Sequence, residues 1–204
     1  MSAPTEVLDF VLPGEWWRIP LDLGEAATTD SIRGLVQTVV GRSDELASRR
    51  AELREQLAAT TAAAKKVQAH QLYLATRIVG SLPFPVSLVV AWPDLPVSVL
   101  GSPVERAELV AASLPEGSQS QELDVVELSG VAAARTTSVR SAVYEVEGES
   151  LTLPHLDVNY WVTVEGVERV ALLSFTSPMV ELTAELIELF DAVISTISVR
   201  NPVA

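Results

Sequence analysis

The chain has 204 residues, a length typical of one compact domain with its own hydrophobic core. Apolar residues make up 48% and charged residues 20%, which excludes disordered and collagen-like chains, and the absence of cysteine excludes disulfides and thiolate chemistry. Because the formal net charge of −13 repels phosphate backbones and anionic membranes, we expect no nucleic-acid partner.

Localisation signals are missing from the sequence as well. The most apolar stretch, residues 84–92, is less than half of the roughly 20 residues that a membrane-spanning helix needs, so we expect no membrane insertion. The first ten residues carry acids where a secretion signal has a basic leader and an apolar run, which predicts a cytoplasmic protein. Lysine is rare beside arginine, and alanine and valine are abundant, a composition typical of GC-rich genomes such as those of actinobacteria.

The chain begins with a predicted hairpin followed by a helix. Two short strands, residues 7–12 and 15–19, are separated by a Pro-Gly turn signal that favours their pairing. A helix is predicted to start at Thr29 or Asp30 and to end at Gly41. Its apolar positions recur at steps of three and four: Ile32, Leu35, Val36, Val39 and Val40.

The longest predicted helix spans residues 44–68. Its apolar seam changes from leucines to small residues along the chain: Leu46, Leu53, Leu57, Thr60, Ala64 and Val67. At about 1.5 Å per residue this helix is roughly 37 Å long, so part of it must project or cross several strands. Three bases, Arg49, Arg50 and Arg54, gather near its start.

These features give the long helix a predicted role. We expect its leucines to pack on the domain, and its small-residue half or arginine cluster to mediate self-association or to bind an acidic partner. The alternative is a plain amphipathic helix that lies wholly on the sheet.

From residue 71 the hydrophobic period changes to two, which is typical of strands. Strands are predicted over residues 71–79, 86–92, 121–128, 131–139, 142–146, 155–164 and 168–176. The nearly continuous apolar run of 86–92 favours a central strand. Helices are predicted from Ser102 to about Leu114 and over residues 179–198. Runs of strands between helices, without strict alternation, predict a single α+β domain over residues 1–204, with a mainly antiparallel sheet flanked by helices.

Two terminal segments carry a resemblance to a known fold family. The segment Phe10-Val-Leu-Pro-Gly-Glu-Trp16 and the segment Val170-Ala-Leu-Leu-Ser-Phe-Thr-Ser-Pro178 are similar to the opening strand and the last strand of the Mog1/PsbP-like family. The resemblance implies an α/β/α sandwich and a protein that acts by binding other proteins, with no catalytic residues to carry over. The long helix over residues 44–68 departs from the family pattern.

Residues that carry catalysis or bind cofactors are sparse. The two histidines, His70 and His155, are far apart and lack a second ligand at helical spacing, which favours surface positions over a metal site. The sequence contains no Gly-x-Ser-x-Gly nucleophile elbow and no glycine-rich phosphate loop. We therefore expect no catalytic residue, cofactor or metal.

Acidic residues form two candidate clusters. Glu145, Glu147 and Glu149 alternate along one extended segment and are either a solvated face or a cluster that binds a cation or a proton.

On the last helix, Glu181, Glu185, Glu188 and Asp191 form an acidic stripe. This stripe is either solubilising charge or a surface for a basic partner.

Aromatic residues form a candidate pocket. Trp16 and Trp17 are adjacent in a strand and so face opposite sides of the sheet, and Tyr160 and Trp161 repeat this arrangement. Together with Trp92, the side chains of Trp17, Tyr160 and Trp161 are predicted to line a small apolar pocket or partner groove. The alternative is that they fill the core beneath flanking helices.

Two function classes follow from these observations. The first is a non-catalytic cytoplasmic protein-binding or adaptor protein with an unidentified protein partner, and an accessory role in an actinobacterial secretion or envelope-associated system suits it. The second is a small-ligand-binding protein or an enzyme of unfamiliar type that uses Glu145 and Glu147 near Tyr144 and Tyr160. A deep apolar pocket with converging polar groups favours the second class, whereas a continuous core with shallow grooves favours the first.

Overall fold

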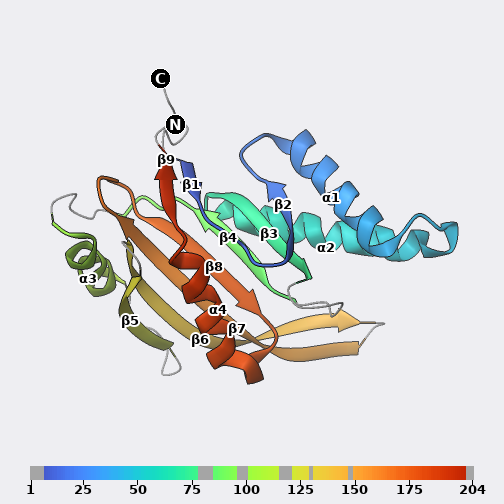
Figure 1. Cartoon of the computed structure of the whole chain (residues 1–204). Helices are drawn as coiled ribbons and strands as arrows, with labels where there is room; N and C mark the ends of the chain where they lie inside the picture. The colour runs from blue at the N-terminus through green and yellow to red at the C-terminus, as the bar shows by residue number, and fades with distance from the viewer. Residues whose placement is uncertain are drawn as a thin grey trace.

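The computed structural model describes residues 7–77, 85–95, 101–114, 121–128, 131–146 and 149–200. In this part of the chain, a seven-stranded antiparallel sheet, a two-stranded sheet and four α-helices form one α+β domain (Figure 1). The larger sheet has the spatial order β2-β3-β4-β8-β7-β6-β5. Its strands are β2 (Glu15–Pro20), β3 (Ala69–Arg77), β4 (Ser87–Ala91), β5 (Gln121–Leu128), β6 (Val131–Val146), β7 (Glu149–Val164) and β8 (Ala171–Ser177).

The helices follow the predicted periodicity. They are α1 (Glu25–Val40), α2 (Ala47–Lys66), α3 (Pro103–Ser113) and α4 (Thr183–Ile194), with the short 3-10 helices η1 (Asp44–Leu46) and η2 (Val180–Leu182) before α2 and α4. At the start of α3 the Ser102 side chain accepts a hydrogen bond from the Glu105 amide, and the Glu105 side chain bonds back to the Ser102 amide. Gly41, with a φ of 85°, ends α1 as predicted.

The largest core lies between the sheet and α4. Alternate residues of the inner strands point to this face and are buried: Leu88, Val90, Val158, Tyr160, Leu173 and Phe175. From α4, Leu186 and Phe190 reach this layer, and the Phe190 ring stacks on Phe175 with ring centroids 4.2 Å apart. The last helix thus docks on the sheet through Leu186 and Phe190. β4 lies between β3 and β8, so the predicted strand over residues 86–92 is an inner strand, as expected.

The opposite face carries two separate groups of helices. Over β2, β3 and β4, the helices α1 and α2 cover a second core that contains Ile19, Leu72, Val36 and Leu57. Over the other end of the sheet, α3 covers a third core around Val110, with Ala134 and Val170. Helices therefore flank both faces of the sheet, as the α+β prediction requires.

The predicted N-terminal hairpin is wrong. β1 (Val7–Asp9) pairs with β9 (Ser198–Arg200) near the other end of the chain, whereas β2 pairs with β3. All six residues of β2 pair with β3, and side chains of both strands are buried in the second core. β1 has only three residues and so cannot form as many cross-strand contacts with β2. β9 also occupies the end of the segment predicted as the last helix, and α4 stops at Ile194.

Three other boundaries differ from the predictions. α1 begins at Glu25, before the predicted start at Thr29 or Asp30. Thr28 lies in its first turn, where its hydroxyl donates a hydrogen bond to the Pro20 carbonyl oxygen at 2.7 Å and ties this turn to the end of β2. β6 is one continuous strand where two were predicted, and β7 begins six residues before His155, at Glu149. Its register with β6 extends over the full length of both strands.

Two parts of the chain extend beyond the seven-stranded sheet on the same side of the molecule (Figure 1). The helical arm consists of α1, η1 and α2. The strand arm consists of residues 139–146 and 149–155, where β6 and β7 pair with each other, because the register of β5 ends opposite Ser138 and that of β8 ends opposite Leu156. Since α2 buries only Leu57, Thr61 and Ala64, it projects as its length predicted and does not lie wholly on the sheet.

Candidate functional site

The four aromatic side chains predicted to share a pocket lie in three different clusters. Trp17 packs against α1 in the second core, and Trp161 packs against α3 in the third. Trp92 and Tyr160 are buried in the core beneath α4. Trp16 packs against that same core, so it faces the side opposite to Trp17, as predicted. The four residues therefore fill the core and do not line one pocket.

The acidic cluster of Glu145, Glu147 and Glu149 does not form along one strand. Glu145 belongs to β6 and Glu149 to β7, on either side of a hairpin, and Glu147 lies outside the described residues. Tyr144 pairs with Leu151 near the hairpin end, whereas Tyr160 pairs with Arg135. At about 3.4 Å per residue the two tyrosines are roughly 30 Å apart along the ladder, so they do not share a site.

Among the described residues, no group of three His, Asp or Glu side chains is placed to hold a metal ion. No helix in this part of the chain is both long and apolar enough to cross a membrane.

Asp191 is not part of the solvated stripe on the last helix. Its carboxylate accepts a hydrogen bond from the Tyr160 hydroxyl at 2.6 Å and pairs with the Arg135 guanidinium at 2.8 Å. Arg135 pairs with Asp124 as well, at 3.0 Å. Burial raises the pKa of Tyr160, and its hydrogen bond to Asp191 raises it further. Burial lowers the pKa of Arg135, but its bonds to the two carboxylates outweigh this and raise it. These contacts fasten α4 to the sheet.

The other three acids of the stripe, Glu181, Glu185 and Glu188, are exposed. We expect Glu185→Ala to change the free energy of unfolding by less than about 0.5 kcal/mol, because a surface side chain loses few contacts on truncation. Urea denaturation followed by tryptophan fluorescence measures this. A loss of about 2 kcal/mol would mean that Glu185 is paired and not solvated.

The sequence analysis missed one buried arginine, since an arginine on an amphipathic helix normally lies on the surface. Arg106 of α3 is 3% exposed, and its guanidinium donates to the carbonyl oxygens of Val164, Val167 and Glu168 at 2.7–3.2 Å. Burial lowers its pKa. Arg106 thereby fastens the connection between β7 and β8 to α3, which is a structural role.

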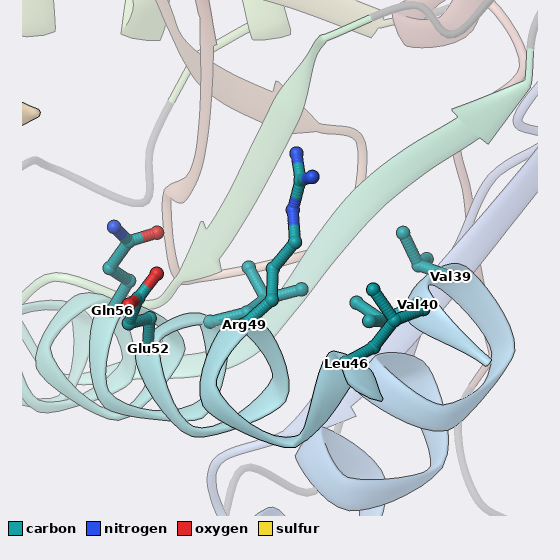
Figure 2. Close-up of a pocket in the computed structure, with 7 residues that line it drawn as sticks. Val39, Val40, Leu46, Arg49, Glu52 and Gln56 are labelled. Carbon is teal, nitrogen blue, oxygen red and sulfur yellow. The ribbon is translucent and has the colours of Figure 1, made fainter. Parts of the chain in front are cut away.

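A hollow of about 500 Å³ lies at the end of the helical arm. We call it the tip groove; it is lined by Val39, Val40, Leu46, Arg49, Glu52, Leu53 and Gln56. Figure 2 shows Val39 and Val40 of α1 beside Leu46, with Arg49 standing up from α2 between them and Glu52. Val39 is 60% exposed and Leu46 is 37% exposed, so two positions of the predicted apolar seams do not pack on the domain. Periodicity cannot show this, because it does not reveal where a helix leaves the sheet.

The three arginines of the predicted partner surface have different surroundings. Arg49 lines the tip groove and is exposed, and Arg54 is exposed one turn further along α2. Arg50 is half-buried and donates to the carbonyl oxygens of Gly41 and Ser43 at 3.2 and 2.6 Å, which holds the connection between α1 and α2. Arg49 and Arg54 are therefore exposed to solvent, whereas Arg50 has a structural role.

A second hollow, of about 580 Å³, lies between the two arms, and we call it the inter-arm cleft. The helical wall of this cleft consists of Leu57, Thr60, Ala63, Ala64 and Val67. The strand-arm wall consists of Arg140, Ala142 and His155. Between the two walls lie residues of β3, β4 and β8, which include Leu74, Ser87, Val89 and Thr176. Arg140 pairs with Asp157, whose carboxylate also accepts the Thr176 hydroxyl at 2.7 Å. This cleft includes the small-residue half of the long helix that the sequence singled out.

No protein-family model matches this chain, and no curated protein matches it. Among solved structures, it is similar to the crystal structure of LpqN, which is involved in cell envelope biogenesis of Mycobacterium tuberculosis. The two chains share 11% sequence identity, the similarity covers 97% of this chain and 84% of LpqN, and the TM-score is 0.40. A similarity at this level assigns neither a family nor a function.

Proposed function

We propose that this chain is a non-catalytic protein-binding protein that holds an acidic partner protein at the tip groove. The observation that carries the proposal is the group of exposed apolar side chains around this groove, at the end of an arm that extends beyond the sheet. Exposed apolar side chains that gather at one place, beside polar groups, are typical of protein interaction sites.

Charge supports an acidic partner. Within α2, the five bases Arg49, Arg50, Arg54, Lys65 and Lys66 stand against the two acids Glu52 and Glu55, so this helix has a net charge of +3 in a chain of −13. A basic surface on an acidic protein attracts acidic partners. Arg49 places one of these positive charges in the groove itself, which the Glu52 carboxylate also lines, whereas Lys65 and Lys66 lie at the other end of α2.

The packing of the domain favours protein binding over the small-ligand and enzyme alternatives. Large aromatic side chains fill the cores, and the tip groove and the inter-arm cleft lie along the arms. A third hollow, of about 500 Å³, lies at the start of α3 beside the connection between β7 and β8. The resemblance to the Mog1/PsbP-like family, whose members act by binding proteins, points the same way. The proposal includes a cytoplasmic accessory role in an actinobacterial secretion or envelope-associated system, for which the absence of a secretion-signal pattern in the first ten residues and the arginine-rich, GC-type composition are the support.

The test is site-specific photo-crosslinking in the cells that produce the protein. With p-benzoylphenylalanine in place of Val39, we expect one crosslinked protein, which mass spectrometry identifies and which binds again when both proteins are purified. Arg49→Glu should weaken that purified interaction at least fivefold, since it puts an acid where an acidic partner docks.

The matched control is Glu185→Lys, which makes the same two-unit change of charge, with the opposite sign, on an exposed part of α4 away from the arm. It should change the affinity less than twofold. Absence of a crosslink at position 39, or an affinity that is insensitive to Arg49→Glu, would contradict the proposal. A crosslinked product with twice the mass of this chain would show self-association instead.

A further inference from the structure

We infer that the inter-arm cleft receives a peptide segment of the partner, and that this segment carries both acidic and large apolar side chains. The inference rests on the proposed function, because it names a part of that partner. It concerns a different surface from the tip groove, so each can fail without the other.

The helical wall of the cleft supplies the apolar contact. Leu57 and Ala64 are buried, whereas Ala63 is exposed and Val67 is 60% exposed, so the wall continues from the core into solvent. Small side chains along this stretch of α2 form low ridges, and a backbone can approach such a surface closely. Covering Val67 and the alanine wall removes apolar area from water, which favours an occupant with apolar side chains.

The charges around the cleft supply the acidic preference. None of the described residues that line it is acidic, while Arg140 and His155 are part of its strand-arm wall. The neighbouring carboxylate of Asp157 is only 9% exposed and already bonds Arg140 and the Thr176 hydroxyl. On α2, Lys65 and Lys66 are exposed directly beside the lining residues Ala64 and Val67. In a chain of −13, the described lining of the cleft holds Arg140, which is paired with Asp157, and His155, and no acid. Together with the exposed Lys65 and Lys66 beside it, this surface complements an acidic segment.

The form of the cleft favours a peptide over a second copy of this chain. The most acidic helix, α4, buries its apolar face on the sheet, so it cannot present acids and apolar side chains together. β5 does expose Leu123 and Val125 beside acidic residues, but it is bonded to β6 at the edge of the sheet and would bring the whole sheet into the cleft. A separate segment of a partner meets no such obstacle.

The test selects peptides without knowledge of the partner. A phage library of random 12-residue peptides is panned against the full chain, and the enriched peptides are synthesised with a fluorescent label for anisotropy titrations. We expect the enriched sequences to combine Asp or Glu with large apolar residues.

Two neighbouring alanines give a matched pair of variants. Ala62 and Ala63 are both exposed on α2, but Ala63 lines the cleft and Ala62 does not. We expect Ala63→Glu to weaken peptide binding at least tenfold and Ala62→Glu to change it less than twofold. Circular dichroism and the thermal midpoint confirm that both variants are folded.

The remaining outcomes overturn the inference. Enrichment of basic peptides, no enrichment, or equal effects of Ala62→Glu and Ala63→Glu would each exclude the cleft as a site for acidic segments. If Val39→Asp weakened the binding of the enriched peptides and Ala63→Glu did not, the peptides would bind at the tip groove. This inference would then be overturned, while the proposed function would remain intact. A dimer in light scattering that Ala63→Glu dissociates would show that a second copy occupies the cleft.

Discussion

Replacing Phe190 with alanine is expected to lower the free energy of unfolding by about 3–5 kcal/mol. The side chain is 1% exposed, and its ring stacks on Phe175 at a centroid distance of 4.2 Å and an interplanar angle of 12°. Phe175 in turn meets the Tyr160 ring edge to face at 6.0 Å. Truncation therefore removes the transfer free energy of a whole ring and leaves a cavity against a rigid sheet.

Urea denaturation, with the same denaturant slope for both proteins, measures the effect of Phe190→Ala. The control is Leu189→Ala on the same helix, which removes an aliphatic side chain that is only partly buried and should cost less. A loss of less than about 1 kcal/mol for Phe190→Ala would mean that α4 does not dock on the sheet through this residue.

The sequence predicted the helices well because their signals are local. The 3.6-residue period of Leu186, Phe190 and Ile194 marks the buried face of α4, and Ser102 with Glu105 marks the start of α3. Each of these signals lies within a few residues of the element that it defines. The α+β class followed from the order of such elements.

Strand partners and hollows depend instead on residues far apart in the chain. β1 pairs with β9 from the other terminal region, and no local pattern distinguishes this partner from the neighbouring β2. The inter-arm cleft brings α2 together with residues of β6, β7 and β8, which are more than 70 positions later in the sequence. The sequence singled out the small-residue half of the long helix but contained no signal for the opposite wall.

Asp191 illustrates the same limit for a single side chain. Its spacing from Glu181, Glu185 and Glu188 assigns it to an acidic stripe, and the spacing is correct for one side of a helix. Asp191 nevertheless differs from the three glutamates, because Arg135 on β6 and Tyr160 on β7 lie beneath its end of the helix. An arginine in a predicted strand gives no indication of which acid it will meet.

For this reason we expect Asp191→Ala to cost about 2–3 kcal/mol of unfolding free energy, far more than truncation of any glutamate in the stripe. The substitution takes an acceptor from both the Tyr160 hydroxyl and the Arg135 guanidinium, and it leaves Arg135 with Asp124 as its remaining carboxylate. The Arg135 Nε is already buried without a hydrogen-bond partner. The estimate lies below the value for a fully buried pair because the Asp191 and Arg135 side chains are 25% and 15% exposed, so water partly replaces the lost contacts.

Two further variants separate this ion pair from a general effect of charge on α4. Glu188→Ala removes a carboxylate three residues earlier on the same helix and should change stability by less than about 0.5 kcal/mol, because that side chain is exposed. Tyr160→Phe removes one of the two donors to Asp191 but keeps the ring in the core and should cost about 1 kcal/mol. If Asp191→Ala proved as mild as Glu188→Ala in urea denaturation, the contact of Asp191 with Arg135 and Tyr160 would contribute nothing to holding α4 on the sheet. The docking of this helix would then depend on Leu186 and Phe190 alone.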